Sequence, residues 1–527
     1  MSVPATITRL GAARSRARSE RARARTLPQS WPLIALLLLG AALRLSTIGL
    51  QSFWYDEAFT PVHVIHPSLI ATMKTMAHTE NSPPLWYFII WAWTRLFGIG
   101  VVAMRLPSAF AGIALIAVAW GIGSELSGRR AAIAAAALAT FNPLFVWYSQ
   151  EARTYELYAL MGGLALLCFL RAEAKPTGRR MAAFALASAL ALLSHYFAVF
   201  LLVPMALWLL RRRDRWRVTV PAIGAVAVVG IALIPLLLSQ GGHGTQWIGA
   251  WPLASRLEAI PQYYLTGYSG APLGHGIELL VALPLIVGFL YGLWRGLDAI
   301  ESRGAWITAA LAACGVLIPI IIIAFGFDYL APRNLIAAMV PVTGLLAVVL
   351  ASRRAGRAGA ALLAAAAIAF LAICIDVDLN PRLQRGDWRG VAAVVRSPAG
   401  VVPSAATAGS HTASRAGAPA AAHLLATVHL GSAPLQYYIP SLKPLASQRT
   451  ILVGEIDEVA YPPLLPTAGK PPLPGFHLLS KHDVNGLVVY RFGTAHPQPL
   501  TASRLRYDGL SREAAEVFVA PGSGYRT

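Results

Sequence analysis

Charged residues are scarce in this sequence, and acidic residues above all. Only 13% of the 527 residues are charged, whereas 56% are hydrophobic; an ordinary soluble domain has about 25% charged residues. A single soluble core stops growing at about 250–300 residues, so it cannot bury this much apolar surface. A bilayer can accommodate it, with about 20 apolar residues for each helical crossing. The composition therefore predicts a polytopic membrane protein.

Cysteine is scarce as well, and the cysteines that are present lie singly within apolar runs. Their odd number and their spacing give no sign of a disulfide framework or of a cysteine-based metal site. We expect Cys168, Cys314 and Cys374 to be small residues in helix packing.

Basic residues, by contrast, outnumber acidic residues by 44 to 24, which gives a net charge of +20. In a soluble protein this excess would suggest nucleic acid. Here the arginines lie in clusters between apolar runs, which is the topology signal of a membrane protein, and we expect no nucleic-acid partner. The first apolar run, Trp31–Leu50, is longer than the apolar part of a signal peptide and has no small-residue cleavage site after it. We expect a retained helix with a basic cytoplasmic tail over residues 1–30.

The topology depends on one ambiguous segment, Pro84–Gly98, which is apolar and aromatic but short for a crossing. If it crosses the membrane, five arginine clusters fall on the outer side, against the positive-inside rule. If it lies along the outer surface as an interfacial helix, every cluster falls inside. We prefer the second alternative.

The predicted fold class is then an all-α polytopic membrane protein with about eleven transmembrane helices and a small C-terminal extracytoplasmic α/β domain. The transmembrane domain is expected over 31–375 and the C-terminal domain over 376–527, with a low-complexity linker near 397–423. Thr450–Val453 and Gly486–Arg491 look like strands of the C-terminal domain. The predicted crossings are 31–50, 106–127, 129–147, 154–171, 181–194, 196–210, 218–238, 276–294, 305–325, 332–351 and 358–375.

On this topology, acidic residues gather at the outer ends of the helices. Asp56 and Glu57 follow the first crossing, where an acidic pair is costly without a partner or a task; the plain alternative is a solvated loop. Glu151 and Arg153 lie between the third and fourth crossings, where a local ion pair at the membrane surface is the plain alternative.

Two further residues complete the outer set. His195 lies in the turn between the fifth and sixth crossings, where an interfacial histidine with satisfied hydrogen bonds is the simpler interpretation. Arg333 opens the tenth crossing and is either a membrane anchor or a fixed cation for a phosphate group. Glycosyl transfer from a lipid phosphate needs such a set, because a carboxylate must take the proton of the acceptor hydroxyl and a cation must stabilise the departing phosphate.

The order of short motifs resembles the GT-C glycosyltransferase superfamily, in the branch that includes bacterial lipid A aminoarabinose transferases and protein O-mannosyltransferases. The resemblance covers about residues 31–395. Its motifs are Trp54-Tyr55-Asp56-Glu57, Asn81-Ser82-Pro83-Pro84-Leu85-Trp86-Tyr87, Arg105-Leu106-Pro107-Ser108-Ala109, Asn142-Pro143-Leu144-Phe145, Tyr148-Ser149-Gln150-Glu151-Ala152-Arg153, Pro332-Arg333-Asn334-Leu335 and Asp387-Trp388-Arg389-Gly390.

The resemblance implies a GT-C-like fold and a role for each matching residue. Asp56 would be the catalytic base, with Glu57 as its neighbour. Glu151 lies where the family often has a second acidic residue that orients the acceptor or holds a metal. Arg333, and Arg153 with it, would bind the donor phosphate.

His195 and Tyr148 are further candidates for the site. Metal use differs within the superfamily, so a divalent metal ion is left open as a cofactor. The implied partners are a polyprenyl-phosphate-sugar donor, a cell-envelope acceptor (a glycan, lipid or protein) and the membrane lipid.

The expected function is therefore an inverting transfer of one sugar, mannose-like or another, outside the plasma membrane. The alternatives are a transporter or lipid flippase, a non-catalytic envelope assembly protein, and a polysaccharide polymerase or ligase that uses diphosphate-linked donors. Transporters usually carry charged or broken segments at mid-membrane and repeated halves. An assembly protein would not require Asp56.

Overall fold

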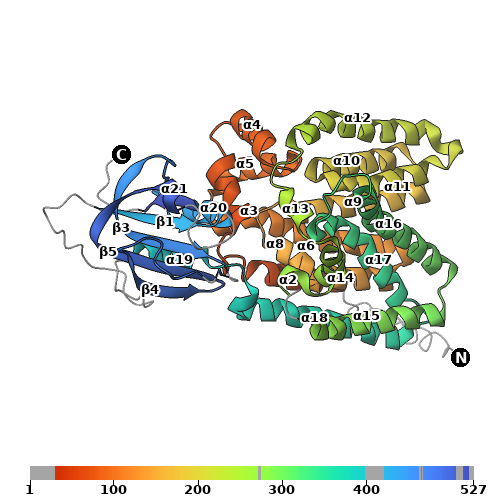
Figure 1. The fold of residues 1–527 in the computed structure, drawn as a ribbon. Coiled ribbons are helices and arrows are strands. Elements are labelled where there is room, and N and C mark those ends of the chain that lie inside the picture. Colours follow the sequence, from red (N-terminus) through yellow and green to blue (C-terminus); the bar gives the residue numbers. More distant parts are fainter. Residues whose placement is uncertain are drawn as a thin grey trace, which may run out of the picture.

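The computed structural model describes residues 30–270, 274–397, 421–461, 464–465, 467–505 and 514–520. The chain forms a long helical bundle with an α/β domain at one end (Figure 1). The predicted tail over 1–30 and most of the predicted linker near 397–423 lie outside the described residues.

The bundle contains a helix, or a pair of helices, at each of the eleven predicted crossings. Its elements are α2 (Trp31–Leu45), α6 (Val101–Ser127), α7 (Arg129–Phe141), α8 (Pro143–Ser149), α9 (Tyr155–Ala174), α10 (Gly178–Ser194), η2 (Tyr196–Ala198), α11 (Val199–Leu210), η3 (Arg213–Arg215), α12 (Trp216–Gln240), α15 (His275–Arg295), α16 (Ala299–Ile323), η5 (Pro332–Ala338), α17 (Met339–Leu350) and α18 (Gly356–Leu379).

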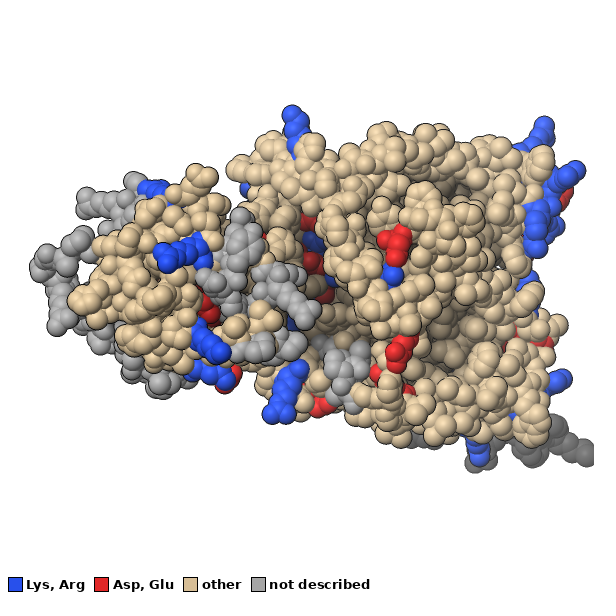
Figure 2. Space-filling model, viewed as in Figure 1, with Lys and Arg blue, Asp and Glu red and all other residues tan. Residues whose placement is uncertain are grey.

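Among the described residues, seven helices are long and apolar enough to cross a membrane, or eight if the bent pair of α7 and α8 counts as one crossing. Helices α2, α10 and α11 are shorter. The sides of the bundle expose large aliphatic side chains from many helices, such as Leu38, Leu207, Ile231, Leu280 and Ile368. Figure 2 shows this surface as mostly uncharged. Exposed apolar surface of this extent needs lipid. The protein is a multi-pass membrane protein, and eleven crossings stays a prediction.

Small residues let the helices of the bundle approach closely. Helix α7 is rich in alanine, and a Cβ atom on Gly123 of α6 would lie 2.3 Å from the carbonyl oxygen of Ala131. Such contacts supply the van der Waals packing that holds helices together in lipid. Helix α7 ends at Phe141, the side chain of the next residue, Asn142, caps α8, and Pro143 occupies the first position of α8, where proline is favoured. The two helices meet at a bend of 56°.

The basic clusters share one end of the bundle. They lie in the turns between α6 and α7, α9 and α10, α11 and α12, α15 and α16, and α17 and α18. Contacts join several of these turns, for example Arg171 with Glu125, Arg303 with Glu173, and Arg353 with Asp298. Figure 2 shows Lys and Arg gathered at the end of the bundle opposite the α/β domain.

The segment Pro84–Gly98 does not cross the bundle. It forms α5 (Leu85–Phe97), which packs beside α4 (Leu69–Thr79) next to the α/β domain (Figure 1). Helix α5 has 13 residues and is therefore about 20 Å long, against about 30 Å for the hydrocarbon core. The helix buries Trp86, Tyr87 and Ile90. This geometry agrees with a helix that does not cross the bundle; its position along the outer membrane surface stays a prediction.

The α/β domain is built on a six-stranded sheet with the strand order β2-β6-β1-β3-β5-β4. Strands β1 and β3 are parallel, and the other pairs are antiparallel. The predicted strand Thr450–Val453 lies within β3, and the predicted strand Gly486–Arg491 lies in β5 except for Gly486. The elements are α19 (Trp388–Arg396), β1 (Ala422–Thr427), α20 (His429–Tyr438), β2 (Lys443–Pro444), β3 (Thr450–Ala460), β4 (His477–Val484), β5 (Leu487–Thr501), α21 (Ala502–Leu505) and β6 (Glu516–Val519). The expected domain boundary at 375/376 falls inside α18, which runs to Leu379, and η6 (Pro381–Leu383) follows it.

Candidate active site

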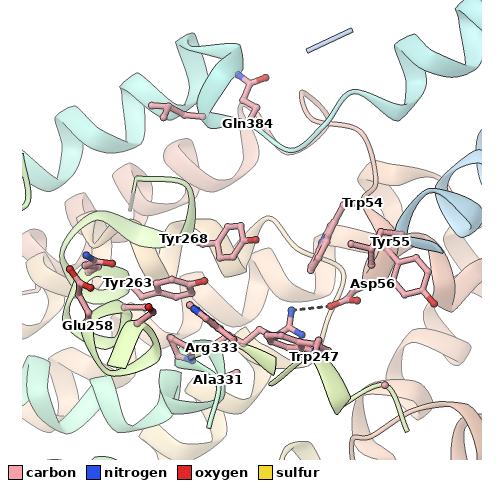
Figure 3. Close-up of a pocket in the computed structure, with 18 of the residues that line it drawn as sticks. Trp54, Tyr55, Asp56, Trp247, Glu258, Tyr263, Tyr268, Ala331, Arg333 and Gln384 are labelled. Carbon is pink, nitrogen blue, oxygen red and sulfur yellow. Dashed lines mark hydrogen bonds and ion pairs between the residues drawn. The ribbon is translucent and has the colours of Figure 1, made fainter. Parts of the chain in front are cut away.

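A cavity of about 1110 Å³ opens at the end of the bundle that faces the α/β domain. Its wall combines α3 (Tyr55–Phe59), α13 (Gln246–Ala250), α14 (Leu253–Gly270), the start of η5, and the connection from α18 to the α/β domain. Aromatic side chains dominate the lining, and Figure 3 shows them around Asp56 and Arg333. The aromatic residues of the wall are Trp54, Tyr55, Trp247, Trp251, Tyr263 and Tyr268.

Asp56 and Arg333 form an ion pair on the cavity wall, with 3.0 Å between Oδ2 and Nη1. The two side chains are 20% and 18% exposed, so both reach the cavity without being fully solvated. The guanidinium lies within 6 Å of three ring centroids, those of Trp247, Tyr155 and Trp54, at 5.0, 5.4 and 5.9 Å. Aromatic faces attract a cation at these distances. They hold the Arg333 side chain in the wall.

Glu57 points away from the cavity. Successive helical residues are turned by about 100°, so Asp56 and its neighbour on α3 face different sides. Glu57 is fully buried and accepts two hydrogen bonds from Arg105, at 2.7 and 2.6 Å. The backbone N–H of Ala152 donates a third, at 2.9 Å. Burial alone would raise the pKa of Glu57, but the charges of Arg105 and Arg385 and these hydrogen bonds lower it below its usual value.

Glu151 is buried against Arg385, which enters from the connection between η6 and α19. The Nη2 atom of Arg385 lies 2.8 Å from Oε2 of Glu151, and its guanidinium stacks on Trp147 at 3.9 Å from the ring centroid. Burial raises the pKa of Glu151 despite this partner, and the nearby negative charge of Glu57 adds to the rise. Glu151 therefore belongs to a buried charged layer behind the cavity.

Arg153 belongs to the same layer. It donates to both carboxylate oxygens of Glu80, at 3.0 and 3.2 Å, and to the carbonyl oxygen of Asp56, at 3.3 Å. The guanidinium thus binds the backbone beside the expected base and a buried carboxylate. It is not among the residues that line the cavity.

His195 and Tyr148 both contact Tyr155, whose ring lies against the Arg333 guanidinium. The ring of His195 stacks on Tyr158 with 4.7 Å between centroids, and its Nδ1 accepts from the backbone N–H of Phe197. Burial lowers the pKa of His195 to about 3, and the positive charge of Arg333 adds to the effect. Tyr148 is buried edge-on to Tyr155. The plain interpretation of His195, a histidine with satisfied contacts, describes this geometry.

Of the seven expected site residues, Asp56 and Arg333 line the cavity and the other five do not. Their chemical roles stay predictions. The sequence interpretation missed much of the wall, notably Trp247, Glu258, Gln262 and Glu278 from the segment treated as a plain outer loop and the start of the following crossing. The aromatic residues of that loop were the available signal. The charge partners Glu80 and Arg385 were missed as well, because nothing local marks them.

Metal binding has no evident site in the part of the chain that the structure describes. No group of three or more His, Cys, Asp or Glu residues there could hold a metal ion. The chemistry available to the described residues is a carboxylate beside a guanidinium in an aromatic cavity. Such a site can accept a proton and bind a phosphate at adjacent points.

Residues 81–238 match the family model of dolichyl-phosphate-mannose-protein mannosyltransferases. The match includes helix α5 and the Tyr148–Arg153 motif. It confirms the predicted relation to glycosyltransferases that use polyprenyl phosphates and the predicted class of membrane glycosyltransferase. It does not favour a transporter or an assembly protein. No curated protein sequence matches the chain.

Solved structures of similar proteins include ArnT from Cupriavidus metallidurans bound to undecaprenyl phosphate. That chain has 12% identity and a TM-score of 0.49, with 88% of the present chain and 98% of ArnT covered. The archaeal oligosaccharyltransferase AglB from Archaeoglobus fulgidus, in complex with an inhibitory peptide and a dolichol-phosphate, has 14% identity and a TM-score of 0.46. The coverage there is 78% of the present chain and 63% of AglB.

Proposed function

We propose that the protein transfers one sugar, with inversion, from a polyprenyl-phosphate-linked donor to a cell-envelope acceptor outside the plasma membrane. The observation that carries the proposal is the Asp56–Arg333 pair on the wall of the large aromatic cavity. The donor class follows the family model, whose description names a dolichyl-phosphate-linked sugar.

Asp56 is the base of the proposed reaction. Its carboxylate takes the proton from the acceptor hydroxyl as that oxygen attacks the anomeric carbon. The bond from the anomeric carbon to the phosphate oxygen breaks as the new glycosidic bond forms, and the polyprenyl phosphate leaves. Because attack comes from the face opposite the leaving group, one displacement inverts the anomeric centre.

Arg333 is the cation for the phosphate. A guanidinium carries five N–H donors in a planar fork that matches phosphate oxygens. The contact with Asp56 is made through Nη1, at 3.0 Å, so one side chain can contact the base and the leaving phosphate together. The surrounding rings remove most of the Arg333 side chain from solvent, and reduced solvation strengthens an electrostatic interaction.

The sidedness of the proposal comes from the basic end of the bundle. The arginine-rich turns lie opposite the α/β domain, and cytoplasmic loops are the ones enriched in Lys and Arg. We therefore place the cavity and the α/β domain outside and the N-terminus in the cytoplasm. A topology reporter fused in the Arg171–Arg180 turn should report the cytoplasm; an outside report would contradict the proposed orientation.

Asp56→Asn tests the base directly. Loss of general base catalysis should lower the transfer rate in membranes by about 10²–10⁴-fold. The matched control is Asp483→Asn, which changes an exposed carboxylate on β4 and should leave transfer at the wild-type rate. Near-normal transfer by a well-expressed Asp56→Asn variant would remove Asp56 from the reaction.

The substrates can be identified by comparing lipid-linked sugars and envelope glycans between a deletion strain and the complemented strain. The proposal expects a polyprenyl-phosphate sugar to accumulate on deletion and one glycan residue to disappear. Accumulation of a diphosphate-linked donor instead would favour a polymerase or ligase.

A further inference from the structure

The α/β domain contributes a side chain to the cavity wall. His429, the first residue of α20, lines the cavity together with Leu430. Its Nε2 atom lies 2.8 Å from the hydroxyl oxygen of Tyr55, which immediately precedes Asp56. Its Nδ1 atom lies 2.6 Å from Oε1 of Glu516 on β6. A hydrogen-bonded chain therefore runs from the sheet of the α/β domain to the loop that carries the proposed base.

The carboxylate at one end of this chain fixes a proton on Nδ1 of His429. A carboxylate of Glu516 can only accept, so Nδ1 of His429 carries the proton and donates to it. In the neutral imidazole Nε2 is then an acceptor and takes the O–H of Tyr55, whereas in the imidazolium Nε2–H donates to the Tyr55 oxygen. In the first case the Tyr55 oxygen can accept a hydrogen bond from a group in the cavity, and in the second its O–H can donate one.

The rest of α20 holds this arrangement in place. Near its other end, the hydroxyl of Tyr438 accepts from the backbone N–H of Phe53 at 2.8 Å, and Tyr437 packs on the ring of Phe53. The hydroxyl of Ser52 donates to Gly386 at 2.8 Å, on the connection into the α/β domain. The segment from Ser52 to Tyr55 is thus bonded to the α/β domain at several points.

The position of Tyr55 indicates which substrate it would meet. In Figure 3, Asp56 lies between Arg333 and Tyr55. Arg333 marks the donor phosphate in the proposed function, and the base must stand between the donor and the attacking hydroxyl. The far side of Asp56, where Tyr55 and His429 lie, is therefore the acceptor side.

We propose that Tyr55 and His429 form an acceptor subsite for a hydroxyl-bearing substrate, with Glu516 as the residue that positions His429. This inference rests on the proposed function. It gives the α/β domain a defined part in the reaction: it completes the acceptor side of the site that the bundle alone leaves open.

The first test measures how the transfer rate depends on each substrate separately. The acceptor probe is the envelope fraction of a strain that lacks the protein, and the donor probe is the polyprenyl-phosphate sugar extracted from the same strain. Tyr55→Phe and His429→Ala should each raise the half-saturating amount of acceptor by about tenfold, because a substrate hydrogen bond is lost. The half-saturating amount of donor should stay at the wild-type value.

Two further variants separate positioning from folding. Glu516→Gln should raise the half-saturating amount of acceptor less than His429→Ala does, because the imidazole is still present. The double variant Tyr55→Phe/His429→Ala should raise the half-saturating amount of acceptor no further than the single variant with the larger effect. The reason is that the two residues act through one another. The matched control, His482→Ala, removes an imidazole from β4 at the opposite edge of the sheet. It should leave the half-saturating amounts of both substrates at the wild-type values.

The second test does not need turnover. Binding of the same envelope fraction is measured to Asp56→Asn and to Asp56→Asn/His429→Ala. Binding that is about tenfold weaker in the double variant supports the subsite even if transfer is never detected. Equal binding, or a rise in the donor requirement instead of the acceptor requirement, overturns it. Transfer retained by Asp56→Asn, in contrast, contradicts the proposed function and leaves the binding comparison to decide the subsite.

Discussion

Two carboxylates that are neighbours in the chain, Asp56 and Glu57, lie in two different electrostatic environments. Asp56 faces the cavity in a partly exposed pair with Arg333, whereas Glu57 is fully buried against Arg105 with three hydrogen bonds. The first arrangement leaves an oxygen free to react, and the second satisfies both oxygens. The acidic pair is therefore divided between the cavity wall and the buried layer. In the proposed function, Asp56 takes part in the chemistry and Glu57 holds α3 in position.

The same contrast applies to the arginines. Arg333 has one carboxylate partner and an aromatic surround, and it lines the cavity. Arg105, Arg153 and Arg385 each bind a buried carboxylate from another part of the chain. Breaking a pair in the buried layer should therefore affect folding, and changing a cavity residue should affect the rate.

The largest effect is expected for Arg105→Ala. It leaves the carboxylate of Glu57 buried without its main partner, which costs about 3–5 kcal/mol of folding free energy. The yield of folded protein and the thermal unfolding midpoint in detergent should both fall sharply. A variant with wild-type thermal stability would show that the buried layer does not hold the loop.

Arg333→Ala should reverse this pattern. Loss of a preorganised donor to a developing oxyanion lowers the rate by about 10²–10³-fold, while the thermal midpoint changes little because the side chain is at the cavity surface. The control is Arg357→Ala, because Arg357 lies on α18 at the basic end of the bundle. This variant should keep the wild-type transfer rate. A large loss of folded protein in Arg333→Ala would place this arginine with the structural group.

Arg385→Met should destabilise the protein by less, about 1–3 kcal/mol. The smaller cost arises because Glu151, whose pKa burial already raises, can take up a proton and become neutral. Adding Glu151→Leu should restore the thermal midpoint, since an apolar pair can replace a buried ion pair.

Transfer by the Arg385→Met/Glu151→Leu variant decides the role of Glu151. Recovery of both stability and transfer would make this residue structural. Recovery of stability alone would support the acceptor-orienting role that the family resemblance implies.

The smallest effect is expected in the pH dependence of the thermal stability. His195 has its pKa lowered to about 3 from 6.5 by burial. Between these values the unfolded chain binds a proton that the folded chain does not, so the free energy of unfolding falls as the pH falls. His195→Asn keeps a capping acceptor but does not titrate. Its thermal midpoint should fall less than that of the wild type between pH 6.5 and about pH 5. An equal fall in the two proteins would show that other groups control the stability in this pH range.

Sequence reasoning alone was enough for the membrane class, the helices at the eleven predicted crossings, the separate helix at Leu85–Phe97 and two strands of the C-terminal domain. These follow from hydrophobic run length, charge clusters and alternation, which are local properties of the chain. The sequence also singled out Asp56 and Arg333 through short motifs. It could not rank them above Glu57, Glu151 or Arg153, because a motif does not state which way a side chain points.

The pairing of the buried charges, in contrast, became evident from the three-dimensional packing alone. Glu57 and Arg105 are 48 residues apart, and Glu151 and Arg385 are 234 residues apart. In a low-dielectric layer, a buried charge is tolerated only beside an opposite charge, and that partner is supplied by packing rather than by sequence neighbourhood. The same packing brought His429 to Tyr55 and joined the α/β domain to the cavity.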